Sequence, residues 1–299
     1  MKQKKYSSGD SQFRAWIQAI VIITVLFGVF TASSRTATKL EATKTATART
    51  ESATDIQDSY ENIDKTNIQD GIITINYMIL DNLRYKVMIK KDNSSQFYDL
   101  TLTGNKNYPL QMGSGDYMVW VLRQKVDDKF SVVYKETVKA TIKDSKKVYL
   151  QSIGEVNWNE NMEVIQKAKE LTIDCKTDEA KVDAIYKYVA KSIKYDSAKE
   201  KLVPTMSFYI TDIEETFETG KGICYDYSSI FASMLRSVGV PTKMVKGYSK
   251  IGKVSNLHAW NEVYVNGQWK VVDPTYGASF GLSVVRYENP SNFTKTQEL

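Results

Sequence analysis

The sequence predicts an α+β fold in its C-terminal half, preceded by a small β-sandwich and an N-terminal apolar helix. Between about Gly71 and Leu150, apolar and polar residues alternate with the period of two that is typical of short strands. From about Asn157 the apolar spacing becomes helical, and after Val238 it returns to that of strands. Helices followed by neighbouring strands favour an antiparallel sheet over a doubly wound parallel one.

The N-terminus carries the pattern of a membrane-spanning or signal segment. A basic head, residues 1–14, precedes residues 15–32, "AWIQAIVIITVLFGVFTA", which hold no charged side chain. This mostly apolar run is just long enough to cross a bilayer, and the basic head is expected on the cytoplasmic side. Residues 15–32 are therefore predicted to be a transmembrane signal anchor or a cleaved signal peptide, which places the following domains outside the cell.

Two segments separate this run from the helical part. Residues 33–69 are rich in Thr, Ala and Lys and are predicted to be a disordered linker. Residues 70–151 are predicted to be the β-sandwich accessory domain, with turn clusters such as Gly113–Asp116 between its strands. The strand-like segments are "ITINYMI", "YKVMIK", "FYDLTLTG", "DYMVWVLRQ", "FSVVYKETVKATI" and "VYLQ". Because this domain holds no His or Cys, a spacer or binding module is expected.

Charge and composition exclude several functions. The net charge of +5 comes from the first 50 residues, and the rest of the chain holds 32 basic against 33 acidic residues. A nearly neutral folded part gives no basis for nucleic-acid binding. A single histidine and the lack of closely spaced acids argue against zinc and calcium sites, so no metal and no cofactor are expected.

Residues 152–299 are predicted to be the catalytic domain. Asn159 is expected to cap a first helix, "NENMEVIQKAKEL", and Thr177 a second one. A third helix is expected from Cys224 to Val238, and Asn266-Gly267 is a strong signal for a hairpin between two later strands. The second helix carries one apolar stripe, which consists of Val182, Ile185, Tyr186, Val189 and Ile193.

Three side chains within this domain suit nucleophilic catalysis. Cys224 follows Gly220 and Gly222 at a helix N-terminus, where unpaired N–H groups and the helix dipole stabilise a thiolate. His258 begins one strand of the predicted hairpin, and Asp273 ends the other nearly opposite it, so the carboxylate can orient the imidazole. The alternatives are an inert thiol, a core histidine and a turn aspartate, or a disulfide between Cys224 and Cys175.

The motifs around these residues carry a family resemblance. "TGKGICYDYSSIFASMLRSVGVPTKMVKGY" and "HAWNEVYVNGQWKVVDPTYG" resemble the transglutaminase-like domain, a branch of the papain-like fold, over about residues 165–277. The resemblance implies Cys224 as nucleophile, His258 as general base and then acid, and Asp273 as orienting residue. It also implies Tyr195, in "KYD", as an oxyanion donor beside the backbone N–H of Cys224. The alternative for Tyr195 is an aromatic residue that closes the helical core.

The predicted function is an extracellular, cysteine-dependent amide hydrolase or acyl transferase that works through a thioester. A transglutaminase-like peptidase is the first interpretation, with a protein-glutamine transglutaminase or a catalytically silent surface-binding module as alternatives. The expected partners are a protein or peptide substrate, with cell-wall peptide as one candidate, and the membrane through the N-terminal helix. The expected location is the cell membrane with the domains outside, or the medium after signal cleavage.

Overall fold

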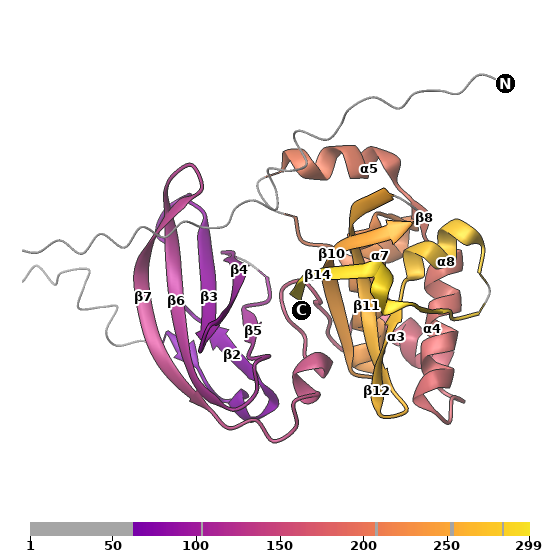
Figure 1. Ribbon diagram of the computed structural model, residues 1–299, viewed down its shortest axis with the longest axis horizontal. Helices are drawn as coiled ribbons and strands as arrows, with labels where there is room; N and C mark the ends of the chain where they lie inside the picture. The colour runs from indigo at the N-terminus through magenta and orange to yellow at the C-terminus, as the bar shows by residue number, and fades with distance from the viewer. Residues whose placement is uncertain (1–61, 103, 207–208, 252–253, 283) are drawn as a thin grey trace, which may run out of the picture.

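The computed structural model describes residues 62–299, except 103, 207–208, 252–253 and 283. Figure 1 shows a β-rich part, β1 to β7, beside an α+β part that contains the later elements. The predicted head (1–14) and membrane segment (15–32) lie outside the described residues, as does most of the predicted linker. None of the helices in the described part of the chain is long and apolar enough to cross a membrane.

Two antiparallel sheets make up the β-rich part. The larger has the strand order β4-β3-β6-β7 and the smaller β1-β2-β5. Their bounds are β1 Ile63–Asp64, β2 Ile72–Ile75, β3 Tyr85–Lys91, β4 Ser94–Leu100, β5 Asn107–Pro109, β6 Gly115–Val126 and β7 Lys129–Ala140. Buried side chains from both sheets form one cluster, to which β6 contributes Tyr117, Val119 and Val121. The period-two pattern thus reflects one buried face of each strand.

The secondary structure predicted from the sequence was wrong at both ends of the β-rich part. Strand β1 lies within the predicted linker, where Ile63 is fully buried among polar neighbours that hide its pattern. The segment "VYLQ", expected as a strand, instead begins in the 3₁₀ helix Lys147–Leu150. There Val148 and Tyr149 are consecutive buried residues, which a strand with one exposed face would not give.

The α+β part begins with helices. The bounds are α3 Glu163–Thr172, α4 Asp178–Ser192, α5 Ser197–Leu202, α6 Ile213–Thr219, α7 Cys224–Ser237 and α8 Pro274–Phe280. The predicted cap of α4 is confirmed, because the Ala180 N–H donates to the Thr177 side chain at 3.2 Å. The predicted stripe of α4, from Val182 to Ile193, is buried throughout.

The predicted cap of α3 is wrong. The helix starts at Glu163, and the Asn159 side chain instead accepts from the Asn161 N–H in the preceding turn. The first N–H groups of α3, those of Glu163 and Val164, donate to the carboxylate of Glu214 on α6, each at 3.1 Å. A cap supplied from such a distant part of the chain leaves no local sequence signal.

A five-stranded antiparallel sheet with the order β13-β12-β11-β10-β14 completes this part. The bounds are β8 Lys194–Tyr195, β9 Lys221–Gly222, β10 Thr242–Ile251, β11 Val254–Val265, β12 Gln268–Val272, β13 Tyr287–Glu288 and β14 Phe293–Glu298. The predicted Asn266-Gly267 turn is confirmed, with φ of 52° and 78° at its two residues. Strands β8 and β9 form a separate parallel pair.

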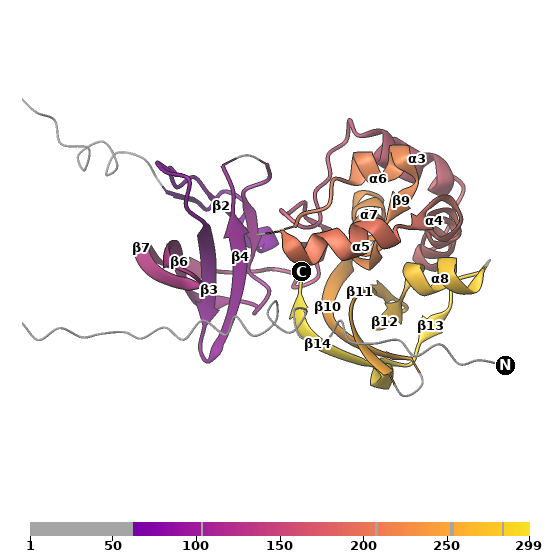
Figure 2. The ribbon, with the colours of Figure 1, turned by 90° about the horizontal axis from the view of Figure 1, so that it is seen from above.

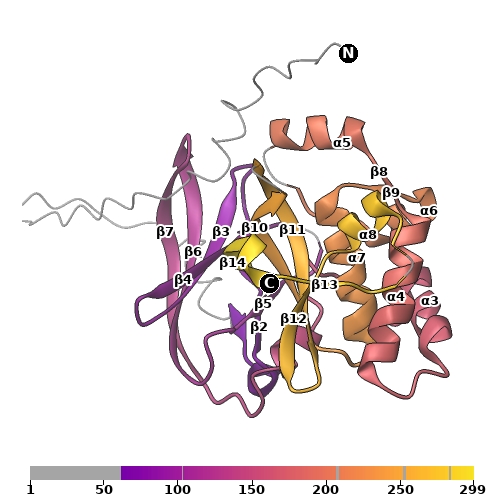
Figure 3. The same cartoon turned by 45° about the vertical axis from the view of Figure 1, so that its right-hand side comes forward.

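Helix α7 is the central element of the α+β part. It packs on β10 and β11 with one side and on α3, α4 and α6 with the other, as Figures 2 and 3 show. Apart from the two residues at its start, every side chain of α7 up to Arg236 is buried. Such burial on all sides fixes the rotation of the helix and hence the direction of its N-terminus.

Strand β14 joins the two parts. Leu299, just beyond it, is fully buried and exchanges backbone hydrogen bonds with Met244. The Gln297 side chain donates to the Phe97 carbonyl of β4 at 3.0 Å. Arg236 of α7 donates to the Leu299 carbonyl and to that of Gln151, which precedes the helices. These contacts place the β-rich part against α7 and against the N-terminal end of β10 in the five-stranded sheet.

Gly247 on β10 gives a test of this sheet. The register of β10 with β14 shifts at Lys246/Gly247, and a Cβ on Gly247 would run into the Thr294 carbonyl and the Trp260 ring. We expect Gly247→Ala to lower the free energy of unfolding by about 2–3 kcal/mol, measured by urea denaturation. Gly154→Ala is the control, because its Cβ would make only an ordinary contact at 3.7 Å. Equal stability of the two variants would contradict the packing described.

Candidate active site

Cys224 is the first residue of α7. It follows the parallel strand pair of β8 and β9 and is half-buried, with the first backbone N–H groups of the helix around it. Gly222 is required here because a Cβ would lie 2.7 Å from the Cβ of Asp226. Gly220 ends α6 in the left-handed conformation, with φ of 59°. The alternative of a disulfide between Cys175 and Cys224 is wrong, because both thiols are free.

His258 and Asp273 form a direct pair. Imidazole Nε2 lies 2.6 Å from Asp273 Oδ2, and both side chains are nearly or fully buried. His258 comes from β11, whereas Asp273 lies just beyond β12 as the N-cap of α8. Its second carboxylate oxygen accepts from the Tyr276 N–H at 3.1 Å. Both oxygens of Asp273 are therefore held, which fixes the carboxylate against the ring.

The hairpin brings this pair together in the register that the sequence predicted, with Asp273 one residue beyond the end of β12. Val265 pairs with Gln268 and Asn261 with Val272, so continuing the register would place Asp273 opposite Trp260. His258 lies two residues further along β11, on the same face, and Asp273 reaches it diagonally from the helix cap. The sequence thus predicted the proximity of the two residues and their near-opposite places in the hairpin, but not that Asp273 caps a helix.

Tyr276 holds the imidazole from its face. The two rings stack with centroids 5.0 Å apart and planes 17° from parallel. The Tyr276 hydroxyl lies 2.8 Å from the Ser249 Oγ on β10, which holds the ring in place. Because Nε2 is bonded to Asp273, the remaining nitrogen, Nδ1, is left for Cys224. Tyr276 was not among the site residues that the sequence predicted, although its position three residues after Asp273 in a capped helix could have indicated it.

Helix α7 is fastened to β11 next to this pair. The Ser228 Oγ, one turn after Cys224, donates to the Trp260 carbonyl at 2.8 Å. The Asn261 side chain donates back to the Ser228 carbonyl at 3.0 Å. Both bonds are buried, so sliding of the helix along the strand would leave buried polar groups unpaired. The register between Cys224 and His258 is therefore fixed by two residues that do not take part in the chemistry.

The environment of His258 favours its charged form. Burial lowers the pKa of His258, but the charge of Asp273 and hydrogen bonds to Asp273 and Cys224 raise it to about 10. Since an unperturbed imidazole titrates near 6.5, the ring is an imidazolium at neutral pH. The contribution of the His258–Asp273 pair to the stability of the folded state is fully present below about pH 6.5. It is lost as the pH rises through about 10.

Tyr195 lies close to the start of α7, but its hydroxyl has another partner. The pairing of β8 with β9 sets Tyr195 opposite Gly222, two residues before Cys224. Its hydroxyl donates to the Glu200 carboxylate at 2.9 Å. Burial raises the pKa of Tyr195, as do the nearby Cys224 and the bond to Glu200. Its predicted role as oxyanion donor requires the hydroxyl to leave Glu200 and stays a prediction.

Asp226 is a further buried acid that the sequence analysis did not assign. It is fully buried two residues after Cys224, and its carboxylate accepts from the Ile223 N–H at 2.9 Å. An acid at the third position of a helix is a recognised capping signal, but its other partners are distant in sequence. Among the described residues, no group of three His, Cys, Asp or Glu side chains is arranged to hold a metal ion.

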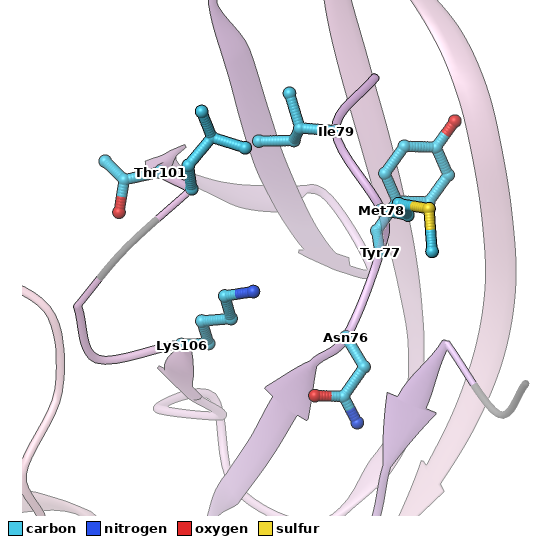
Figure 4. Close-up of a pocket in the computed structure, with 7 residues that line it drawn as sticks. Asn76, Tyr77, Met78, Ile79, Thr101 and Lys106 are labelled. Carbon is cyan, nitrogen blue, oxygen red and sulfur yellow. The ribbon is translucent and has the colours of Figure 1, made fainter. Parts of the chain in front are cut away.

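The structure also contains a surface cavity of about 250 Å³ in the β-rich part. Figure 4 shows it, with Lys106 projecting toward the segment that carries Asn76 and Tyr77. Its other lining residues are Met78, Ile79, Thr101 and Leu102. None of these belongs to the Cys224 region, so this cavity is not the place where the His258–Asp273 pair could act.

Comparison with known proteins identifies the central segment. Residues 165–274 match the model of the Transglutaminase-like superfamily, so this stretch is a transglutaminase-like domain. Kyphoscoliosis peptidase of Homo sapiens is 35% identical over 117 residues, which are 36% of this chain and 17% of that protein. The chain therefore matches less than a fifth of the length of this relative.

Two further similarities are found. The Protein-glutamine gamma-glutamyltransferase of Pseudomonas aeruginosa is 35% identical over 71 residues, which are 20% of this chain and 11% of that protein. A solved structure from Cytophaga hutchinsonii, named as a candidate cysteine protease, superposes with a TM-score of 0.42 at 15% identity. The superposed region covers 73% of this chain and 81% of the chain in that structure.

Proposed function

We propose that the transglutaminase-like domain of this chain is a cysteine-dependent enzyme that cleaves or transfers amide-linked acyl groups. Cys224 is the nucleophile, His258 the proton carrier and Asp273 the residue that orients it. The observation that carries this proposal is the 2.6 Å bond between His258 and Asp273, formed beside a cysteine at a helix N-terminus. Together they supply a nucleophile, its base and an orienting carboxylate within one site.

The proposed chemistry begins from a thiolate beside an imidazolium. The Cys224 sulfur attacks the amide carbonyl, and a carbon–sulfur bond forms as the carbonyl π electrons move to oxygen. His258 donates its proton to the amide nitrogen, the carbon–nitrogen bond breaks and the amine leaves, so that a thioester remains. An acceptor then attacks this thioester, gives its proton to His258 and releases the Cys224 thiolate.

The oxyanion of each tetrahedral intermediate needs hydrogen-bond donors. The backbone N–H of Cys224 is one, because the first N–H groups of a helix have no partner within the helix. The hydroxyl of Tyr195 is the proposed second donor, after it leaves the Glu200 carboxylate. Tyr195→Phe would then slow turnover without changing the alkylation of Cys224 by a small reagent.

The acceptor decides between two reactions of the same site. Water gives a peptidase or deamidase, whereas an amine gives a transglutaminase. We favour water, because the longer of the two sequence matches given above is to a peptidase and the shorter to a gamma-glutamyltransferase. A silent binding module is the second candidate; the closeness of His258 and Asp273 argues against it.

We also propose a cellular location for this enzyme and a role for its β-rich part. Residues 15–32 would anchor or export the chain, so that both folded parts act outside the cell. The two sheets of the β-rich part would form an accessory β-sandwich that presents a peptide substrate. In support, Cys224 and Tyr225 pack against the cluster that contains the core of this part. Lys246 of β10 lies over the Tyr225 ring, 4.8 Å from its centroid.

Incubation of the full chain with a peptide library, with and without a primary amine, tests the proposed function. Mass spectrometry distinguishes chain cleavage, deamidation and amine incorporation. We expect cleavage or deamidation that is absent from a Cys224→Ala variant. Amine incorporation in place of hydrolysis would favour the transglutaminase, and no reaction with any peptide would favour the silent module.

A further inference from the structure

Asp226 is the most densely bonded buried carboxylate near Cys224. The Tyr209 hydroxyl and the Thr211 hydroxyl donate to its Oδ1 at 2.5 and 2.8 Å. Its Oδ2 accepts from the Ile223 N–H at 2.9 Å and pairs with the Lys199 ammonium at 3.1 Å. We call Asp226, Lys199, Tyr209 and Thr211 the Asp226 clamp. It joins the nucleophile helix to two other segments of the chain.

The four donors explain why this position holds an aspartate. A carboxylate only accepts hydrogen bonds and has room for about four, whereas an asparagine would turn an N–H₂ group toward two of the donors. Helix capping alone does not require a charge, since neutral side chains cap equally well. A fully buried charge is unfavourable unless it is paired, and here Lys199 supplies the opposite charge. The charge therefore serves the contact with α5.

The segments held by the clamp are otherwise weakly attached. Helix α5, which carries Lys199, has no buried residue. Its neighbouring Glu200 accepts from Tyr195, so α5 is fastened on one side to the clamp and on the other to the proposed oxyanion donor. Tyr209 packs edge-on against Tyr225 at 5.6 Å, next to Cys224 in the chain. Together, the Asp226 clamp and the bond between Tyr195 and Glu200 set the position of α5 and of the Tyr195 and Tyr209 rings near Cys224.

We propose that Asp226 is a positioning residue that holds α5 and Tyr209 as one wall of the substrate site. The inference rests on the proposed function, because it assumes that a peptide lies beside Cys224. The reactivity of the sulfur depends instead on His258, which hydrogen-bonds Cys224, and on Asp273, which holds the imidazole. Loss of the clamp should therefore weaken the binding of a peptide more than it slows the attack of sulfur on a small reagent.

Two alkylating probes separate these effects. Iodoacetamide reports the reactivity of the Cys224 sulfur, and an N-acetyl tetrapeptide chloromethyl ketone must first occupy the site. For Asp226→Asn we expect the inhibition constant of the ketone to rise about tenfold, the loss of one to two good hydrogen bonds. The iodoacetamide rate should stay within about twofold. Tyr209→Phe, which removes one donor and keeps the ring, should act in the same direction by about threefold.

Asp212→Asn is the matched control. Asp212 caps α6 with two N–H bonds but is exposed and makes no contact with Asp226 in the described contacts. Its variant should leave both probe reactions unchanged. If Asp226→Asn does not fold, Tyr209→Phe decides alone. Parallel loss of both reactions, or no change in either, would overturn the positioning role. If wild-type Cys224 reacts with iodoacetamide no faster than Cys175, the proposed function fails instead.

Discussion

Replacing Cys224 by alanine is expected to lower kcat/KM for an amide substrate by at least about a thousandfold, to the level left by binding alone. Sulfur is the atom that forms the proposed thioester, and no neighbouring side chain offers a substitute. The side chain is half-buried at a helix start, so its removal should change folding stability little. Turnover of a peptide found by the library experiment measures the effect, with circular dichroism as a check on folding.

Cys175→Ala is the matched control for this substitution. Cys175 is the other free thiol and lies between α3 and α4, where its sulfur contacts the Leu171 carbonyl at 3.9 Å. It lies outside the group formed by Cys224, His258 and Asp273, so the variant should retain full activity. Activity that survives Cys224→Ala, or that is lost with Cys175→Ala, would show that another group carries the reaction.

Replacing Asp273 by alanine is expected to lower kcat/KM by about a thousandfold as well. The substitution removes the acceptor for His258 Nε2 and for the Tyr276 N–H, so the ring loses its orientation and α8 its cap. Loss of the cap should lower the free energy of unfolding by about 1 kcal/mol. Kinetics and urea denaturation on the same preparation separate the two effects, because a loss of stability of this size leaves the enzyme folded.

Asp273→Asn separates the effect of orienting the His258 ring from the effect of the carboxylate charge. The amide oxygen can still accept from His258, as in cysteine enzymes that use asparagine as the orienting residue, so we expect part of the activity to return. Without the carboxylate charge the pKa of His258 falls, and the pH above which the imidazolium is lost should move down from about 10. An alanine variant within tenfold of wild type, or an unchanged alkaline limit in the asparagine variant, would contradict this role.

Local signals in the sequence were enough for several elements around the site. Asn266-Gly267 fixed the hairpin turn because both residues adopt positive φ readily, and Thr177 marked the start of α4. The predicted third helix also begins at Cys224, as α7 does. In each case the cause of the structure lies within a few residues of the signal.

The features that the sequence did not reveal depend on distant residues. Glu214 caps α3 from another helix, and the distant partners of Asp226 come from two segments, α5 and residues 209–211. The Tyr195 hydroxyl is bonded to Glu200, a side-chain contact that periodicity does not predict. The membrane segment, residues 15–32, lies outside the described residues and stays a prediction.

The proposed function depends on activation of the Cys224 sulfur by His258, which hydrogen-bonds it. The most direct measurement is the rate of iodoacetamide alkylation from about pH 5 to pH 10, resolved by peptide mass spectrometry, with Cys175 as reference in the same molecule. We predict that Cys224 reacts at least about ten times faster than Cys175 at about pH 6, where an ordinary thiol is protonated, and that His258→Ala removes this excess. Parallel pH profiles for both cysteines, unchanged by His258→Ala, would contradict the activation of Cys224 by His258.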